Sequence, residues 1–396
     1  MRLFRRGLLA LALVVAGAAV IWGPSYARGL SLVVRAAHLD GWLKTAADAE
    51  ARRWTAGPAT TIPTRHGAIP ARFYRPDGRI RRAAILTPGV HAMGIDEPRL
   101  RGLAGDLAAS GVAIVTIALP DLVRYRFSTA AVDQIEDAGL WLSRQPDLSP
   151  DGRVGLMGIS FAGGLSVVAA GRPAVRDKIA YVFSFGGHGD LARVLRYLCT
   201  GLEPLAPGAP AGTAPRFRAP HDYGVAVILL GLADRIVPPD QVAPLRHGLE
   251  TFLTASQLTL VDMSRASATF KQSQAIAATL PEPSSTLMRY VNERNTRALG
   301  AELLPVLDRI GAEEYPPALS AEQSPPPAAP VYLLHGTDDT VIPAVETRLL
   351  AESLRLRGTT VHPLLSGLIT HAEVDKSAAA GEVMALVRFW AGLLGE

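Results

Sequence analysis

The chain has 396 residues, of which 48% are hydrophobic and 19% charged, and this composition excludes disordered and fibrous proteins because it can bury a large core. The 40 basic residues exceed the 36 acidic ones by four, and Arg2, Arg5 and Arg6 carry three of these charges. The rest of the chain is nearly balanced in charge. This predicts no nucleic-acid partner, since phosphate binding needs a clustered basic face.

Residues 1–27 have the pattern of a membrane-directed segment. After the three arginines comes a stretch without charges, Gly7 to Ala27, which is close to the ~20 residues that cross a bilayer as a helix. Trp22 lies where an interfacial aromatic side chain would. We expect a signal anchor, with membrane contact through this segment and an exported catalytic domain, periplasmic or extracellular. The alternative is a signal peptide cleaved near Ala27, because Ser25 and Ala27 are small, and a secreted product.

The next part of the chain alternates between predicted strands and helices. Thr60–Thr64 and Ile69–Tyr74 form a predicted antiparallel hairpin. Buried strands follow at Ala83–Thr87, Val112–Ile117, Val154–Met157 and Ile179–Phe183, with helices near Arg99–Ser110, Thr129–Arg144 and Phe161–Gly171 between them. Continuous apolar strands separated by helices imply a parallel sheet covered on both faces, so the predicted class is α/β.

The alternation stops near residue 190, where prolines become frequent. We expect a mostly helical insertion, or lid, with helices such as Asp240–Leu253 and Ser285–Leu299. The sheet pattern resumes at Val331–Leu334 and Val361–Leu365 and ends on a helix over 378–394. The predicted domains are a signal segment (1–27), an amphipathic linker (28–58), the first part of the core (59–189), the insertion (190–329) and the second part of the core (330–396).

One serine has the sequence context of a nucleophile. Gly158-Ile159-Ser160-Phe161-Ala162-Gly163 follows the strand Val154–Met157 and opens a helix. A nucleophile at such a turn has a strained backbone, which small neighbours permit, and its hydroxyl is lifted above the sheet. The segment resembles the nucleophile elbow of α/β-hydrolases, with Ala162 where that family usually has glycine.

The resemblance implies a mostly parallel twisted sheet of about eight strands and a catalytic triad in the order serine, acid, histidine. A serine needs a base to remove its proton and a carboxylate to orient that base. The segment from His335 to Pro343 looks like the family's acid turn, which makes Asp339 the acid and leaves Asp338 as an alternative. Asp234 is a second alternative, because Gly231 to Pro238 repeats the same spacing of glycine, aspartate and proline.

The base is expected in the loop after the last strand. Only His362 and His371 follow Asp339, and His362 falls inside a predicted strand, so we assign the base to His371. The remaining histidines are expected to be structural. The oxyanion donors implied by the resemblance are the backbone N–H groups of Phe161 and of Val90, which lies in the loop Thr87 to His91.

The motifs as a set imply a serine hydrolase that cleaves carboxylic esters through an acyl-enzyme on Ser160. The expected partner is a small-molecule ester or acyl substrate, and no cofactor or metal is expected; the single cysteine, Cys199, allows no intrachain disulfide and no CxxC pair. Three alternatives stay open. They are an acyltransferase or a serine peptidase with the same triad, and a membrane-anchored binding module without catalysis.

Overall fold

The computed structural model describes residues 23–38, 40–259, 261–314, 316–370, 373–374 and 380–395. Its main sheet has nine strands in the order β1-β3-β5-β4-β6-β7-β8-β9, with β2 paired to β3. The strands are β1 (Trp54–Ala56), β2 (Thr60–Thr64), β3 (Gly67–Pro76), β4 (Arg82–Thr87), β5 (Val112–Ile117), β6 (Val154–Ile159), β7 (Ile179–Phe185), β8 (Val331–Gly336) and β9 (Val361–Ser366). A separate short hairpin joins β10 (Ile369–Thr370) to β11 (Glu373–Val374).

The sheet is parallel from β5 through β9, and only the strands at its beginning are antiparallel. The predicted α/β class and the mostly parallel sheet are therefore confirmed. The predicted hairpin is also confirmed, because β2 and β3 pair antiparallel with Thr64 opposite Gly67.

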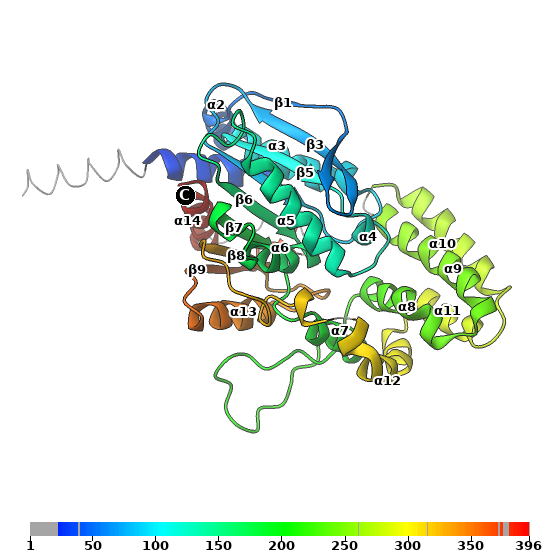
Figure 1. Ribbon diagram of the computed structural model, residues 1–396. Helices are drawn as coiled ribbons and strands as arrows, with labels where there is room; N and C mark the ends of the chain where they lie inside the picture. The colour runs from blue at the N-terminus through cyan, green and yellow to red at the C-terminus, as the bar shows by residue number, and fades with distance from the viewer. Residues whose placement is uncertain are drawn as a thin grey trace, which may run out of the picture.

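Helices cover both faces of this sheet (Figure 1). The helices of the core are α2 (Trp42–Glu50), α3 (Pro98–Ala109), α4 (Pro120–Val123), α5 (Thr129–Ser143), α6 (Phe161–Gly171), α13 (Val345–Leu356) and α14 (Ala380–Gly395), with short 3₁₀ turns η1 (Gly94–Asp96), η2 (Arg176–Lys178) and η3 (Pro317–Leu319). Apolar residues of α5, α6 and α13 share one core, and those of α3, α14 and the helix over 23–36 share the other.

The side chains of the central strands alternate between these two cores. On β4, Ala83 and Ile85 belong to the core with α5, whereas Ala84 and Leu86 belong to the core with α14. This is the period of two that a strand imposes, and because both faces are covered, all four positions are apolar.

The helical insertion lies between β7 and β8, before the penultimate strand of the sheet, as predicted. It comprises α7 (Leu191–Thr200), α8 (Asp222–Ile236), α9 (Pro239–Leu258), α10 (Met263–Ala277), α11 (Ser284–Asn292) and α12 (Thr296–Glu314). Helices α8 to α11 lie at the opposite end of the molecule from α14 (Figure 1). Cys199 on α7 is buried, which raises the pKa of its thiol to about 12.

The single helix predicted over Ser285–Leu299 is wrong, since the structure has two helices there. Arg294 has a left-handed φ of 55°, which ends α11, and the Asn295 side chain accepts a hydrogen bond from Ala298 N at 3.0 Å, which caps α12. A left-handed residue cannot continue a right-handed helix, and an asparagine cap favours a new start.

The beginning of the described chain packs closely on the core. The predicted linker, residues 28–58, contains part of the helix over 23–36, α2 and β1. A Cβ on Gly29 would lie 2.7 Å from the Val387 carbonyl oxygen of α14, so this helix contacts the α14 backbone directly. Within the described residues, none of the helices is long and apolar enough to span a membrane; the expected span lies mostly in residues 1–22, outside them.

Candidate active site

Ser160 sits at the turn between β6 and α6 in a strained backbone conformation. Its φ is 55° and its ψ is −133°, a combination that side-chain-bearing residues rarely adopt and that costs on the order of 1–3 kcal/mol. The residue is 7% exposed, and its N–H donates to the Phe185 carbonyl oxygen at the end of β7, at 2.6 Å. The surrounding structure therefore holds the serine at the carboxyl edge of the sheet.

Glycines around Ser160 permit the sharp turn. A Cβ on Gly158 would overlap the Ala162 carbonyl, and a Cβ on Gly163 would lie 2.5 Å from the Ser184 hydroxyl oxygen. Ala162 itself is buried without conflict, since the close packing that the elbow needs is provided by Gly163. Gly163 thus compensates for the alanine at position 162, where the usual elbow pattern has glycine.

The predicted oxyanion loop lies directly against the serine. A Cβ on Gly89 would be 2.9 Å from the Ser160 Cβ and 3.6 Å from its Oγ. The next residue, Val90, is buried, and its carbonyl oxygen accepts a hydrogen bond of 2.6 Å from the Tyr223 hydroxyl of α8. Phe161 begins α6, so its N–H is among the first four of a helix, which have no partner within the helix.

Asp339 lies in the turn after β8 and is 3% exposed. Its Oδ1 accepts hydrogen bonds from Val341 N at 2.8 Å and Ile342 N at 3.0 Å. Its Oδ2 lies close to Gly186, since a Cβ on that glycine would be 3.5 Å away. Gly186 follows Phe185, and the Phe185 carbonyl oxygen accepts the hydrogen bond from Ser160 N. Ser160 and Asp339 therefore flank the same end of β7.

The two alternative acids lie elsewhere. The Asp338 side chain is 74% exposed and accepts a hydrogen bond from Arg218 at 3.1 Å, so it points to the insertion. Asp234 lies on helix α8 and forms an exposed ion pair of 3.2 Å with Arg246. The repeated spacing around Asp234 thus belongs to a helix and not to a turn after a strand.

His371, the predicted base, lies outside the described residues. The chain that leads to it passes beside the acid turn, because Thr337 N donates to the Ser366 carbonyl oxygen at the end of β9, at 3.1 Å. In sequence, residues 371–372 stand between β10 and β11, which pair antiparallel.

Two side chains near the acid were not assigned a role from the sequence. The buried imidazole of His335 contacts Thr347 Oγ1 at 2.7 Å and the Ile342 carbonyl oxygen at 2.8 Å, and its Nε2 lies 3.4 Å from Asp339 Oδ2. The Tyr197 hydroxyl on α7 donates to the Thr340 carbonyl oxygen at 3.3 Å. Both hold the acid turn in place, and only the tertiary structure brings them together.

His188 is a buried histidine whose ring packs beside that of Phe161. The two rings lie 5.6 Å apart between centroids, and the imidazole Nε2 pairs with the Leu319 carbonyl oxygen at 2.9 Å. Burial lowers the pKa of His188 to about 4, so the ring is neutral near pH 7. Burial also lowers the pKa of His91, the last residue of the oxyanion loop. Across the described part of the chain, no group of three or more His, Cys, Asp or Glu side chains could hold a metal ion.

No protein-family model matches this sequence, and no curated protein matches it. Among solved structures, an esterase of Pyrobaculum calidifontis is similar over 93% of this chain and 90% of its own, with a TM-score of 0.45 and 16% identity. A brefeldin A esterase, a bacterial homologue of human hormone sensitive lipase, is similar over 86% and 76%, with a TM-score of 0.43 and 14% identity. A thermostable carboxylesterase cloned from a metagenomic library is similar over 87% and 90%, also with a TM-score of 0.43 and 14% identity.

These similarities are too distant to assign an activity to this chain. The architecture itself defines the class: a mostly parallel α/β sheet whose carboxyl edge holds a strained serine between a strand and a helix. Any functional assignment depends on the residues at that edge.

Proposed function

We propose that this protein is a serine hydrolase that cleaves carboxylic esters of small molecules through an acyl-enzyme on Ser160. The observation that carries the proposal is the left-handed φ of Ser160 at the β6–α6 turn, because such strain persists where a fixed side-chain position is needed. The contact of Gly89 with Ser160 and the position of Asp339 at the neighbouring strand end support it.

In the proposed reaction, the Ser160 hydroxyl oxygen attacks the acyl carbon while His371 takes the hydroxyl proton. The carbonyl oxygen becomes an oxyanion, which the N–H groups of Phe161 and Val90 stabilise. The oxyanion collapses, the alcohol leaves with the proton from His371, and the acyl group stays on Ser160. Water then attacks the acyl-enzyme with His371 as base, which releases the acid and restores the serine.

Asp339 is proposed to orient His371 and to stabilise its protonated form. Two backbone N–H groups hold Oδ1, and both come from the turn that carries the aspartate itself. Both donors stabilise the carboxylate form that this proposed role needs. Its Oδ2 side faces the end of β7, where Ser160 is held.

The insertion is proposed to act as a lid that limits the size of the acyl or alcohol group. Tyr223 of α8 binds the oxyanion loop through Val90, and the N–H of His221, the residue before α8, donates to the Thr340 carbonyl oxygen at 2.9 Å. The insertion thus touches both the oxyanion loop and the acid turn. A substrate that reaches Ser160 must therefore fit beside it.

The test is hydrolysis of aryl esters of graded acyl length by the full chain and by Ser160→Ala. We expect Ser160→Ala to lose turnover by on the order of 10⁶ if the triad acts as a unit. The matched control is Ser166→Ala on the same helix, which removes another buried hydroxyl and should keep turnover. Wild-type turnover by Ser160→Ala would refute the assignment.

The same protein separates hydrolysis from its alternatives. If the protein is a serine hydrolase, a fluorophosphonate probe should label the wild type and not Ser160→Ala. If it is a binding module without catalysis, the probe should label neither. An added alcohol that raises total turnover and diverts the acyl group into a new ester would instead indicate an acyltransferase. A peptidase would cleave anilides as well as aryl esters, whereas an esterase should leave the anilides intact.

We also propose that residues 1–27 anchor the protein in a membrane, with the catalytic domain exported. The support is the charge-free stretch from Gly7 to Ala27 after three arginines. Alkaline extraction of membranes from expressing cells should leave the full chain in the pellet. Recovery in the supernatant of a shorter product that begins near Arg28 would support cleavage instead.

A further inference from the structure

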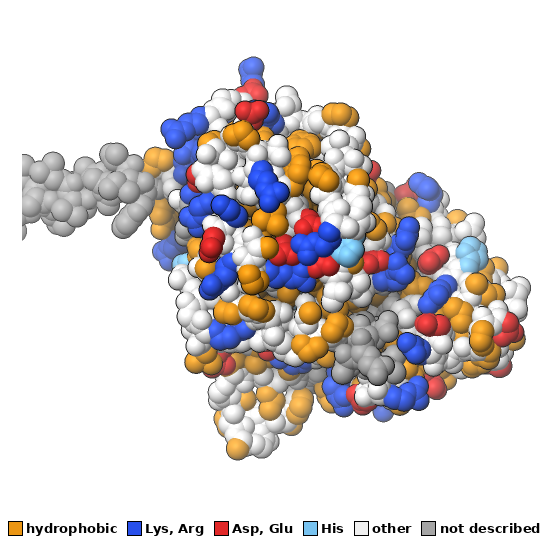
Figure 2. All heavy atoms as spheres, viewed as in Figure 1, with side chains coloured by type: hydrophobic (Ala, Val, Ile, Leu, Met, Phe, Trp, Pro, Cys, Tyr) orange, Lys and Arg blue, Asp and Glu red, His pale blue; other side chains and the backbone are white. Residues whose placement is uncertain are grey.

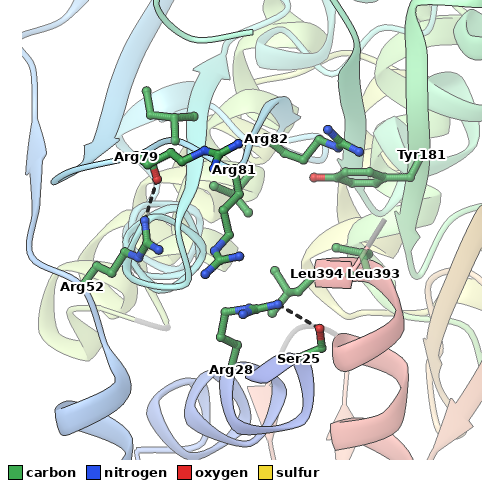
Figure 3. Close-up of a pocket in the computed structure, with 12 residues that line it drawn as sticks. Ser25, Arg28, Arg52, Arg79, Arg81, Arg82, Tyr181, Leu393 and Leu394 are labelled. Carbon is green, nitrogen blue, oxygen red and sulfur yellow. Dashed lines mark hydrogen bonds between the residues drawn. The ribbon is translucent and has the colours of Figure 1, made fainter. Parts of the chain in front are cut away.

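Five arginines surround one cavity at the amino edge of the sheet, the edge opposite Ser160. They come from the helix over 23–36, from the segment after α2, from the loop before β4 and from the first residue of β4: Arg28, Arg52, Arg79, Arg81 and Arg82. The cavity has a volume of about 380 Å³. Figure 3 shows the guanidinium groups of Arg28 and Arg81 approaching the same space from opposite sides.

The positive charge of this arginine cavity is only partly neutralised. Among the described residues, Arg82 pairs with Asp151 at 2.8 Å, and the carboxylate of Glu50 acts on Arg28 and Arg81. Arg52 donates to the Arg79 carbonyl oxygen at 2.6 Å, a neutral acceptor. The cavity therefore keeps an excess of positive charge that an anion would offset.

Arg28 is the buried member of the cluster. It is 7% exposed, and its guanidinium donates to the Ser25 hydroxyl at 2.9 Å, as Figure 3 shows. Among the described residues, its buried Nε has no hydrogen-bond partner. Burial and the neighbouring Arg81 both lower the pKa of Arg28, because the cationic form is poorly solvated and repelled there. A buried cation with an unsatisfied N–H donor and no ion pair of its own costs free energy, and an anion in the cavity would lower that cost.

One wall of the arginine cavity is apolar. Tyr181 at the start of β7 and Leu393 and Leu394 at the end of α14 line it beside the arginines. The ligand that fits both walls has a charged group joined to an apolar one. A phosphate ester of a glycerolipid has this character, whereas free inorganic phosphate would use only the arginines.

We propose that the arginine cavity binds the phosphate of an anionic phospholipid headgroup. Ser25 and Arg28 stand at the end of the charge-free stretch that closes at Ala27, so a membrane that holds the chain before Ser25 would present its headgroups to this edge. Several Lys and Arg side chains lie on this side of the molecule, where the described chain begins (Figure 2). The inference depends on membrane anchoring and does not depend on ester hydrolysis.

The test is calorimetric titration of the full chain in a neutral detergent with dihexanoyl phosphatidylglycerol, dihexanoyl phosphatidylcholine and inorganic phosphate. We expect saturable binding of the phosphatidylglycerol, at least about tenfold weaker binding of the other two, and weakening with salt. Equal binding of inorganic phosphate and phosphatidylglycerol would overturn the lipid assignment in favour of a free-anion site. No saturable binding of either would overturn the site itself.

Arg79 and Arg81 are exposed, so replacing both tests the cavity without removing the buried Arg28. The double variant Arg79→Gln/Arg81→Gln should weaken phosphatidylglycerol binding by about 10- to 30-fold, at roughly one factor of five per arginine. The matched control is Arg144→Gln/Arg265→Gln, which removes two exposed arginines elsewhere and should bind as wild type. An equal loss in both double variants would mean non-specific charge attraction and would refute the proposal.

Discussion

The contact between Gly89 and Ser160 makes Gly89→Ala the most informative single substitution. The added Cβ would lie 2.9 Å from the Ser160 Cβ and 3.2 Å from the Ile159 carbonyl oxygen. Carbon atoms pack at about 3.5–4.0 Å, so the loop and the serine must separate by about 0.6–1 Å. The Ile159 oxygen is a backbone atom and the Ser160 Cβ is bonded directly to the backbone, so neither can rotate out of the way.

A displacement of this size should remove the Val90 N–H from the oxyanion. Misplacement by about 1 Å and loss of one oxyanion donor each cost roughly 10²-fold or more in turnover. We therefore expect kcat on an aryl ester to fall by about 10²- to 10³-fold with a smaller change in KM. Binding of the ester ground state does not use the oxyanion donors fully, which is why KM should change less.

The control for this prediction is Gly102→Ala on α3. A Cβ there meets no heavy atom within 4 Å, so the change should keep kcat and stabilise the fold by about 0.5–1 kcal/mol, because alanine favours a helix. Thermal unfolding of both variants separates a local shift from a global one. A Gly89→Ala protein with unchanged Tm and with kcat within about threefold of wild type would contradict the assigned role of the loop.

Two further predictions concern the acid and a buried histidine. Asp339→Asn should lower kcat by on the order of 10⁴-fold, whereas Asp338→Asn, at an exposed position paired with Arg218, should leave it within about threefold; equal effects would refute the choice of acid. For His188, burial lowers the folded pKa to about 4 from 6.5, so the unfolded state binds more protons between these values and stability falls as pH decreases through them. Urea unfolding should lose about 2 kcal/mol between pH 7 and pH 5, and His188→Gln should lose less; the same loss in the variant would refute this origin.

The strands could be predicted because buried parallel strands are continuous apolar runs, and each run that was assigned to the sheet became a strand. β1 was missed because it has three residues, all exposed, and therefore no hydrophobic pattern. The break between α11 and α12 was missed for a different reason. Arginine is a good helix former, so Arg294 gives no sign of its left-handed φ, and the capping role of Asn295 was overlooked.

The residues of the candidate site could likewise be predicted only in part. Ser160 and Asp339 could be proposed from local motifs, because a strand followed by a tight turn leaves a signature in neighbouring residues. The contact of Gly89 with Ser160 could not be predicted because these residues are far apart in sequence. The contact of His335 with Asp339 could not be predicted because it depends on how the turn after β8 folds back. The arginine cavity is the extreme case, since its residues range from position 25 to position 395 and no local pattern joins them.

The two proposed sites lie at opposite edges of the sheet, and this makes them separable. β4 has six residues, from Arg82 at the arginine cavity to Thr87 at the oxyanion loop, and five rises of about 3.3 Å put about 17 Å between the edges. This is more than the Debye length of about 8 Å at physiological salt, so lipid charge at one edge is screened at the other. Arg79→Gln/Arg81→Gln should therefore weaken phosphatidylglycerol binding and keep kcat on a soluble aryl ester, and Asp339→Asn should do the reverse. If each variant impaired both readouts equally after correction for folding, the two edges could not be the independent sites described above.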